Sequence, residues 1–119
     1  MSSSRVPRRL QDIVDNAQAI FRYTRGMDLS AFEKDRRTYD AVERCLERIC
    51  EAVAKLGDMA MHVMPDQPLQ KIRAFGNVLR HEYDDIEEDQ LFKIVMTDIP
   101  GLHAAAAEAL RKWELFKLP

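Results

Sequence analysis

The sequence predicts an all-α fold, an antiparallel up-and-down bundle of four to five helices. Apolar residues recur at intervals of three and four along most of the chain, which is the period of an α-helix. The apolar–polar alternation typical of a strand is scarce. The 119 residues include only 4 glycines and 5 prolines, so turns are few. Short connections between successive helices make neighbouring helices antiparallel.

The length fits one domain, residues 1–119, which can bury a core without disulfides. The net charge of −2 excludes a general polyanion binder, so RNA would have to be met by a local patch. Cys45 and Cys50 point about 140° apart on one predicted helix and do not bridge, which favours a reducing compartment. No apolar run follows residues 1–5 as in a signal peptide, and none reaches the roughly 20 residues of a membrane span. We therefore expect a cytoplasmic protein without membrane association.

The first helix is expected after a flexible tail of residues 1–6. Pro7 suits the first turn of a helix, and Gly26 ends the apolar pattern. After this helix, Leu29 and Phe32 predict a short turn or helical hook. The residues that recur at helical spacing before Gly26 are Leu10, Ile13, Val14, Ala17, Ile20, Phe21 and Thr24.

A long second helix is predicted from about Asp35 to Leu56, with Gly57 as its end. Its apolar face is broad, and the opposite side carries a basic stripe beside an acidic one. The basic stripe could bind phosphates, but the flanking glutamates favour an ordinary salt-bridged surface. The basic stripe consists of Arg37, Arg44, Arg48 and Lys55, and the acidic stripe of Glu43, Glu47 and Glu51.

The second half of the chain predicts three more helices. Residues 58–64 form either a short helical piece or a loop before the prolines that follow. A third helix is expected over about 68–86 and a short fourth over about 88–96. Asp98 and Pro100 then provide the cap and first turn of a fifth helix.

The third predicted helix carries the most informative pattern of the chain. Five polar side chains fall within an arc of about 100°, opposite its apolar face. Gly76 lies between the two faces, where a missing side chain lets another helix approach. Glycine inside a helix costs roughly 0.5–1 kcal/mol relative to alanine, so it needs a packing or functional reason. The five polar residues are Arg73, Asn77, Arg80, His81 and Asp84.

These side chains offer the chemistry of RNA cleavage without a metal. Histidine moves protons near neutral pH, arginine donates two hydrogen bonds to phosphate oxygens, and asparagine can hold a ribose or phosphate oxygen. A plainer alternative is a solvated helix face held by pairs such as Arg80 and Asp84, and spacing alone favours it.

No other pattern predicts a catalytic or metal centre. His62 and His103 stand alone, and we expect both at the surface. A di-metal bundle would show Glu-x-x-His on two helices, and none of the three histidines has a glutamate three residues earlier. The sequence therefore predicts no metal and no other cofactor.

Asn77, His81 and Tyr83 form an Asn-x-x-x-His-x-Tyr motif at the end of an apolar helix. With this motif and the helical pattern of nearly the whole chain, the sequence resembles the HepT-like family, a branch of the HEPN helical domains. The family pattern has an arginine directly before the asparagine, where this chain has Gly76. Arg80 or Arg73 could supply the missing guanidinium.

The resemblance implies a HEPN-like bundle and a homodimer whose two histidine-bearing helices face each other across a shared cleft. It implies a toxin of a type VII-like toxin–antitoxin pair, a metal-independent endoribonuclease with His81, Arg80, Arg73 and Asn77 at its site. It also implies an antitoxin, a minimal nucleotidyltransferase that neutralises the toxin by adding AMP to Tyr83. The alternative, which Gly76 favours, is a non-catalytic helical dimer that binds a nucleotidyltransferase or a nucleotide.

Overall fold

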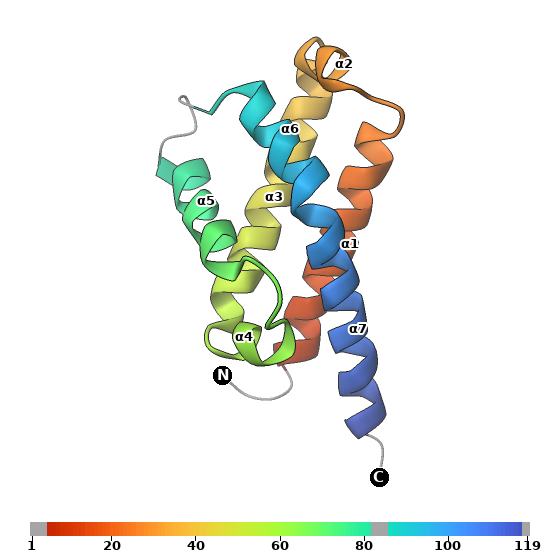
Figure 1. The fold of residues 1–119 in the computed structure, drawn as a ribbon, viewed down its shortest axis with the longest axis vertical. Helices are drawn as coiled ribbons and strands as arrows, with labels where there is room; N and C mark the ends of the chain where they lie inside the picture. Colours follow the sequence, from red (N-terminus) through yellow and green to blue (C-terminus); the bar gives the residue numbers. More distant parts are fainter. Residues whose placement is uncertain (1–4, 82–85, 118–119) are drawn as a thin grey trace.

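A computed structural model describes residues 5–81 and 86–117 (Figure 1). Within these residues the chain is helical with no strand, which confirms the all-α prediction. Five of the helices are those expected for the bundle, and α2 and α4 are single short turns between them. The helices are α1 (Arg5–Thr24), α2 (Leu29–Glu33), α3 (Arg36–Leu56), α4 (Met59–Val63), α5 (Leu69–His81), α6 (Glu88–Thr97) and α7 (Ile99–Lys117).

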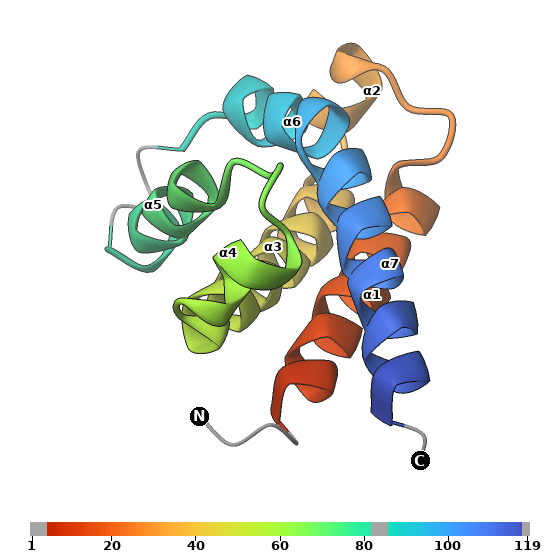
Figure 2. The same ribbon diagram turned by 60° about the horizontal axis from the view of Figure 1, so that its bottom comes forward.

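Helix α3 lies at the centre of the arrangement, with α1 and α5 packed against it on different sides (Figures 1 and 2). Helix α7 packs against α1, and α6 joins α7 to the end of the molecule where α2 lies. Helix α5 runs antiparallel to α3, with α4 and a short loop making the reversal (Figure 1). As a result, α5 has α3 behind it and one long face free for solvent.

Helix boundaries follow from side-chain caps and one left-handed glycine. The Asp28 carboxylate accepts a hydrogen bond from the backbone N–H of Ala31 at 2.8 Å, which starts α2. Asp35 caps α3 in the same way through the N–H of Thr38 at 3.0 Å, and this hydrogen bond holds the pKa of Asp35 below its usual value. Helix α3 ends at Gly57, whose φ of 58° lies in the region that glycine adopts without steric cost.

The core forms around the apolar face of α3, as the helical pattern predicts. An aromatic group closes one end of it, where the Phe32 ring lies 5.2 Å from Phe92 and 5.9 Å from Tyr39. Burial of this face provides the main stabilisation of the bundle, because each fully buried large apolar side chain contributes roughly 1.5–3 kcal/mol. The buried residues of α3 are Tyr39, Val42, Cys45, Leu46, Ile49, Cys50, Ala52, Val53 and Leu56.

Three details of the sequence prediction were wrong. Arg5 and Val6 were expected in the flexible tail but belong to α1, because Val6 is only 2% exposed and extends the apolar stripe. Ile86 was expected inside the third helix but lies outside helical structure, just before α6. It is nevertheless buried, and its carbonyl accepts a hydrogen bond from the Tyr39 hydroxyl at 3.3 Å. His103 is half-buried, with its ring edge-on to Phe21 at 5.3 Å.

Two other expectations concern the cysteines and the membrane. Cys45 and Cys50 are both buried and unbridged, as their spacing predicted. None of the helices in the described residues combines the length and apolar character required to cross a membrane.

Candidate active site on helix α5

Helix α5 presents four of the predicted site residues on one exposed face. Arg73, Asn77, Arg80 and His81 are all exposed, while the opposite face of the helix packs on α3. The buried residues of that opposite face are Leu69, Ile72, Gly76 and Leu79. Tyr83 and Asp84, the two remaining residues of the predicted stripe and motif, lie within 82–85, outside the described residues.

Asn77 and Arg80 are brought into direct contact. One guanidinium nitrogen of Arg80 donates a hydrogen bond to the side-chain oxygen of Asn77, three residues earlier on the helix. The contact holds one edge of the Arg80 guanidinium beside Asn77, on the helical turn that leads into His81. The other guanidinium nitrogens keep their capacity for an anion.

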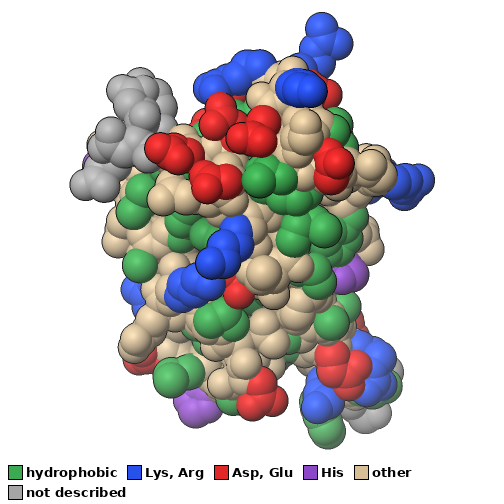
Figure 3. Space-filling view, turned by 45° about the horizontal axis from the view of Figure 1, so that its top comes forward, with side chains coloured by type: hydrophobic (Ala, Val, Ile, Leu, Met, Phe, Trp, Pro, Cys, Tyr) green, Lys and Arg blue, Asp and Glu red, His purple; other side chains and the backbone are tan. Residues whose placement is uncertain are grey.

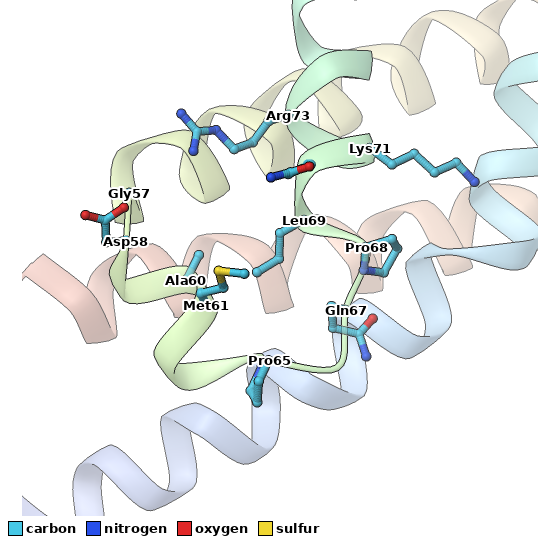
Figure 4. Close-up of a pocket in the computed structure, with 11 residues that line it drawn as sticks. Gly57, Asp58, Ala60, Met61, Pro65, Gln67, Pro68, Leu69, Lys71 and Arg73 are labelled. Atoms are coloured by element: carbon cyan, nitrogen blue, oxygen red, sulfur yellow. The ribbon is translucent and has the colours of Figure 1, made fainter.

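Arg73 does not join this group. Arg73 lies seven positions before Arg80, which corresponds to about 10 Å along the helix axis. Its side chain extends toward the turn of Gly57 and Asp58 at the opposite end of α5 (Figure 4). The structure therefore separates the two guanidinium candidates that the sequence left open, and places only Arg80 near His81.

Gly76 marks the closest approach of α5 to α3. A Cβ atom added at Gly76 would lie 2.6 Å from the Cβ atom of Cys50, a separation that real Cβ atoms essentially never show. The missing side chain thus lets the two helices pack, as the sequence predicted. A guanidinium nitrogen of Arg80 lies 3.7 Å from the same Cβ position. Arg80 therefore brings its charge over the place from which a side chain at position 76 would start.

Three residues of α3 border Arg80, and the sequence placed them in the acidic and basic stripes of α3 without linking them to α5. Glu47, Glu51 and Lys55 line with Arg80 a depression of about 340 Å³ between α3 and α5. Their spacing of four residues puts them on one stripe of α3 and could have indicated a shared neighbour. The expected salt-bridged surface is present in part, since Arg44 contacts the Glu47 carboxylate at 3.1 Å.

Cys50 lies beneath the site without being a reactive thiol. Burial raises the pKa of the Cys50 thiol to about 12, although the nearby Arg80 acts in the opposite direction. Burial also raises the pKa of Cys45. Both thiols therefore stay protonated near neutral pH, and a thiolate nucleophile is excluded.

The remaining histidines and acidic residues do not form a metal site. Over residues 5–81 and 86–117, no three His, Cys, Asp or Glu side chains are grouped so that they could hold a metal ion. His62 is exposed, as expected, and lines a hollow of about 640 Å³ with residues of α7. That hollow shares no residue with α5.

Charged side chains form small separate groups on the surface. Figure 3 shows acidic side chains gathered near the top of one face, and basic side chains in separate small groups. The first turn of α6 supplies Glu88 and Asp89 at this end of the molecule. On this face no continuous positive field is presented to a polyanion, in agreement with the net charge of −2.

A hollow of about 440 Å³ opens at the start of α5 (Figure 4). Arg73 borders it on one side, and Met61 of α4 and Leu69 of α5 supply apolar surface between. Gln67 and Pro68 of the loop complete its wall. The hollow combines an apolar wall with a few polar groups, which is the usual composition of a ligand pocket.

A model of one protein family, described as Ribonuclease HepT-like, matches residues 13–109 of this chain. The chain belongs to the HepT-like family. The matched residues begin within α1 and end within α7, so they include the whole of α5 and its exposed face.

Three curated relatives of this HepT-like protein are archaeal. It is 31% identical to “Putative RNase MJ1380” of Methanocaldococcus jannaschii over 102 residues, which are 86% of this chain and 94% of the relative. It is 32% identical to “Probable ribonuclease HepT” of Thermococcus cleftensis over 103 residues, 87% of this chain and 93% of the relative. It is 33% identical to “Putative RNase MJ0127” of M. jannaschii over 92 residues, 77% and 76% of the two chains. No solved structure matches the chain.

Proposed function

We propose that this HepT-like protein is a metal-independent endoribonuclease whose site lies on the exposed face of α5. The observation that carries the proposal is the contact between Arg80 and Asn77, directly beside His81. It assembles a phosphate-binding guanidinium, a neutral hydrogen-bonding group and a proton-transfer group on one helix turn. Membership in a family described as ribonucleases supports the same reaction class.

In the proposed reaction, the imidazole of His81 takes the proton of a ribose 2′-hydroxyl. The 2′-oxygen attacks the adjacent phosphorus, and the bond from phosphorus to the 5′-oxygen breaks. An acid gives a proton to the departing oxygen, so the products are a 2′,3′-cyclic phosphate and a 5′-hydroxyl. Arg80 donates hydrogen bonds to the phosphate oxygens, whose negative charge grows in the transition state. Asn77 holds the guanidinium in place and can donate from its amide nitrogen.

We further propose a homodimer in which two copies of α5 face each other. His81 is exposed on a convex helix face, so a single copy offers no second histidine and no enclosing wall. A two-fold axis beside α5 would provide a second imidazole as the acid and a second Arg80 for the same phosphate. Light scattering that reports a monomer at micromolar concentration would contradict this part of the proposal.

The biological setting that we propose is a toxin paired with a minimal nucleotidyltransferase antitoxin. The antitoxin would add AMP to Tyr83, two residues after His81. A phosphodiester at that point would compete with the substrate phosphate for the guanidinium of Arg80. Expression of the protein alone should slow growth, whereas the His81→Ala variant should not.

A second candidate function is a dimer that binds the nucleotidyltransferase, or a nucleotide, without cutting RNA. The observation in its favour is the contact between Gly76 and Cys50, which leaves no room for the arginine of the family pattern. This candidate would replace the first if no RNA is cleaved under any condition.

The test is cleavage of end-labelled RNA by purified protein in the presence of a chelator. We expect cleavage with cyclic-phosphate ends, and we expect His81→Ala to abolish it. His62→Ala is the matched control, because His62 is also exposed but borders a different hollow. Cleavage that persists in His81→Ala would remove His81 from the mechanism.

A further inference from the structure

We propose that the hollow at the start of α5 binds one nucleotide of the same RNA strand, about two nucleotides from the bond that His81 cleaves. The proposal rests on the proposed function, because His81 defines the point from which the position is counted. It assigns Arg73 to this subsite instead of the catalytic group. The substrate class that follows is single-stranded RNA.

The hollow has room and surface for a nucleoside. Its volume of about 440 Å³ falls in the range of roughly 300–1,000 Å³ that small-molecule pockets occupy. Met61 and Leu69 both line it and supply its apolar surface (Figure 4). Met61 is 65% exposed, which leaves a large polarisable side chain uncovered at the protein surface. A stacked base would cover it.

Arg73 supplies the charge that the phosphate of such a nucleotide requires. Lys71, the other basic residue at the hollow, contacts the Asp98 carboxylate at 2.8 Å and points the opposite way (Figure 4). Arg73 points toward Gly57 and Asp58, at the rim of the hollow (Figure 4). A guanidinium there can donate two hydrogen bonds to a phosphate.

The position of Arg73 along α5 determines how many nucleotides separate the bound base from the cleaved bond. Arg73 and Arg80 lie within about 20° of each other on the helical wheel, with Asn77 between them in the sequence. Eight residues from Arg73 to His81 correspond to about 12 Å along the axis. Successive phosphates of an extended single strand lie roughly 6 Å apart, so a strand that follows this face takes about two steps between the two residues.

The polar groups of the hollow can form hydrogen bonds with the edge of a base. The hollow accepts only a base that is not paired in a duplex. Gln67, Gln70 and Asp58 offer amide donors and oxygen acceptors around the apolar floor. A base within a duplex is stacked on both faces and paired at its edge, so it cannot enter a hollow of this kind. A single strand can place one base there while its backbone continues along α5.

The test measures binding of a fluorescent single-stranded RNA to the His81→Ala protein, which keeps the strand intact. We expect Arg73→Ala to weaken binding about tenfold and to lower the slope of log K against log salt by about 0.7. We expect Met61→Glu to weaken binding by a similar factor, because it puts a carboxylate where the base stacks. The matched control for the charge is Arg37→Ala, at the far end of α3. The matched control for the methionine is Met96→Glu on α6, because the Met96 side chain is also well exposed, at 55%. Both controls should stay within twofold of the parent.

Abasic substitutions locate the nucleotide. An RNA with one abasic position, moved along the strand, should lose affinity most at a single site about two nucleotides from the cleaved bond. That loss should disappear in Met61→Glu, since the stacking surface is already gone. Equal weakening by Arg73→Ala and Arg37→Ala would show general charge attraction and overturn the subsite. Duplex RNA that binds as tightly, and with the same dependence on Arg73, would overturn it as well.

The two proposals can fail separately. Wild-type protein that cleaves RNA while Arg73→Ala and Met61→Glu bind like their controls retains the nuclease and loses the subsite. Protein that binds RNA through Arg73 and Met61 but cleaves nothing retains an RNA-binding hollow and loses the nuclease.

Discussion

Gly76 and Cys50 face each other so closely that a Cβ atom at Gly76 would lie 2.6 Å from that of Cys50. Position 76 is thereby closed to every other residue while α5 keeps its present distance from α3. In the family pattern this position carries an arginine, and here a guanidinium nitrogen of Arg80 lies 3.7 Å from the same point. The packing of α5 on α3 and the position of the Arg80 guanidinium are therefore linked in this chain.

The first prediction is that Gly76→Ala destabilises the protein. Replacing a glycine inside a helix by alanine normally stabilises it by about 0.5–1 kcal/mol. Here the added methyl group would force α5 away from α3, and such overpacking costs about 1–3 kcal/mol. Denaturant unfolding should show a lower free energy of unfolding than that of the wild type.

Gly101→Ala is the matched control for this prediction. Gly101 also lies within a helix, and a Cβ there would meet only the end of the flexible Gln67 side chain, at 3.2 Å. We expect this variant to be neutral or slightly stabilised. If both variants gain stability, the contact between Gly76 and Cys50 does not limit the approach of the helices.

The sequence predicted the bundle because the apolar period is long and unbroken in α1 and α3. Gly57 and the cap residue Asp35 fixed the ends of α3 to within a residue, since both act through local backbone geometry. The end of α5 was not predictable in this way. Ile86 continues the apolar spacing of the helix, but it is buried through tertiary contact with Tyr39 instead of helix packing.

The sequence predicted that the site residues share one face of α5, but it did not predict which of their side chains come into contact. Helical spacing alone puts Arg73 and Arg80 on one face and says nothing about where two flexible guanidinium groups point. The contact of Arg80 with Asn77 lies within α5 and depends on the rotamer of a flexible side chain. The place of Glu51 and Lys55 beside Arg80 depends on how α5 lies against α3. Gly76 sets the distance between α5 and α3. The sequence indicated that Gly76 allows a close approach, but it did not indicate that Cys50 is the residue approached.

The second prediction concerns alkaline unfolding. Burial, with a contribution from Glu43, raises the pKa of Tyr39 to about 12 from the usual tyrosine value of 10.0. The unfolded chain therefore loses this proton first, and the stability that the neutral tyrosine contributes falls between about pH 10 and pH 12. Tyr39→Phe removes this component. It also leaves the Ile86 carbonyl without its hydroxyl donor, at a cost of about 0.5–1.5 kcal/mol near neutral pH.

The measurement is the free energy of unfolding of both proteins from pH 7 to pH 12. Tyr39→Phe should be the less stable protein at pH 7, and the difference should shrink or reverse above pH 10. Parallel curves across the whole range would contradict the raised pKa of Tyr39.

The third prediction concerns the attachment of α5. Lys71 contacts the mostly buried carboxylate of Asp98, whose side chain is 13% exposed, and thereby ties α5 to the start of α7. Lys71→Met leaves this carboxylate without its cation, and we expect a loss of about 1–2 kcal/mol. Hydrogen exchange should become faster in α5 more than in α1 and α3.

Arg111→Met is the control for the ion pair. Arg111 pairs with Glu108 on the surface of α7, where both side chains are about half exposed. Pairs of this kind contribute little, so the free energy of unfolding should stay close to that of the wild type. Equal effects of Lys71→Met and Arg111→Met would show that the contact between Lys71 and Asp98 does not hold α5.

The fourth prediction concerns the proposed antitoxin. Co-expression with a minimal nucleotidyltransferase encoded beside this protein should add one or more AMP units, visible by intact mass. Tyr83→Phe should remain unmodified and toxic, while Tyr23→Phe, a change at another tyrosine that is exposed, should be modified normally. Modification of Tyr83→Phe at the wild-type stoichiometry would place the AMP elsewhere.

The last prediction concerns the guanidinium of Arg80. Arg80→Ala should lower kcat for RNA cleavage by about 10²–10³, the usual loss when one donor to a developing anion is removed. Arg80→Lys should recover only part of this loss, because an ammonium retains the charge but lacks the planar set of donors. In the proposed site, one of these donors contacts Asn77 while the others bind the phosphate. Free guanidinium added at millimolar concentration should raise the rate of Arg80→Ala and leave that of Arg80→Lys nearly unchanged, because the lysine side chain still occupies the space.

Restoring the family arginine at position 76 should not rescue Arg80→Ala. In the Gly76→Arg/Arg80→Ala protein, the new side chain meets Cys50 before its guanidinium can reach the site. If that double variant cleaves RNA as well as the wild type, α5 can move away from α3 without loss, and the link between Gly76 packing and the position of Arg80 is wrong.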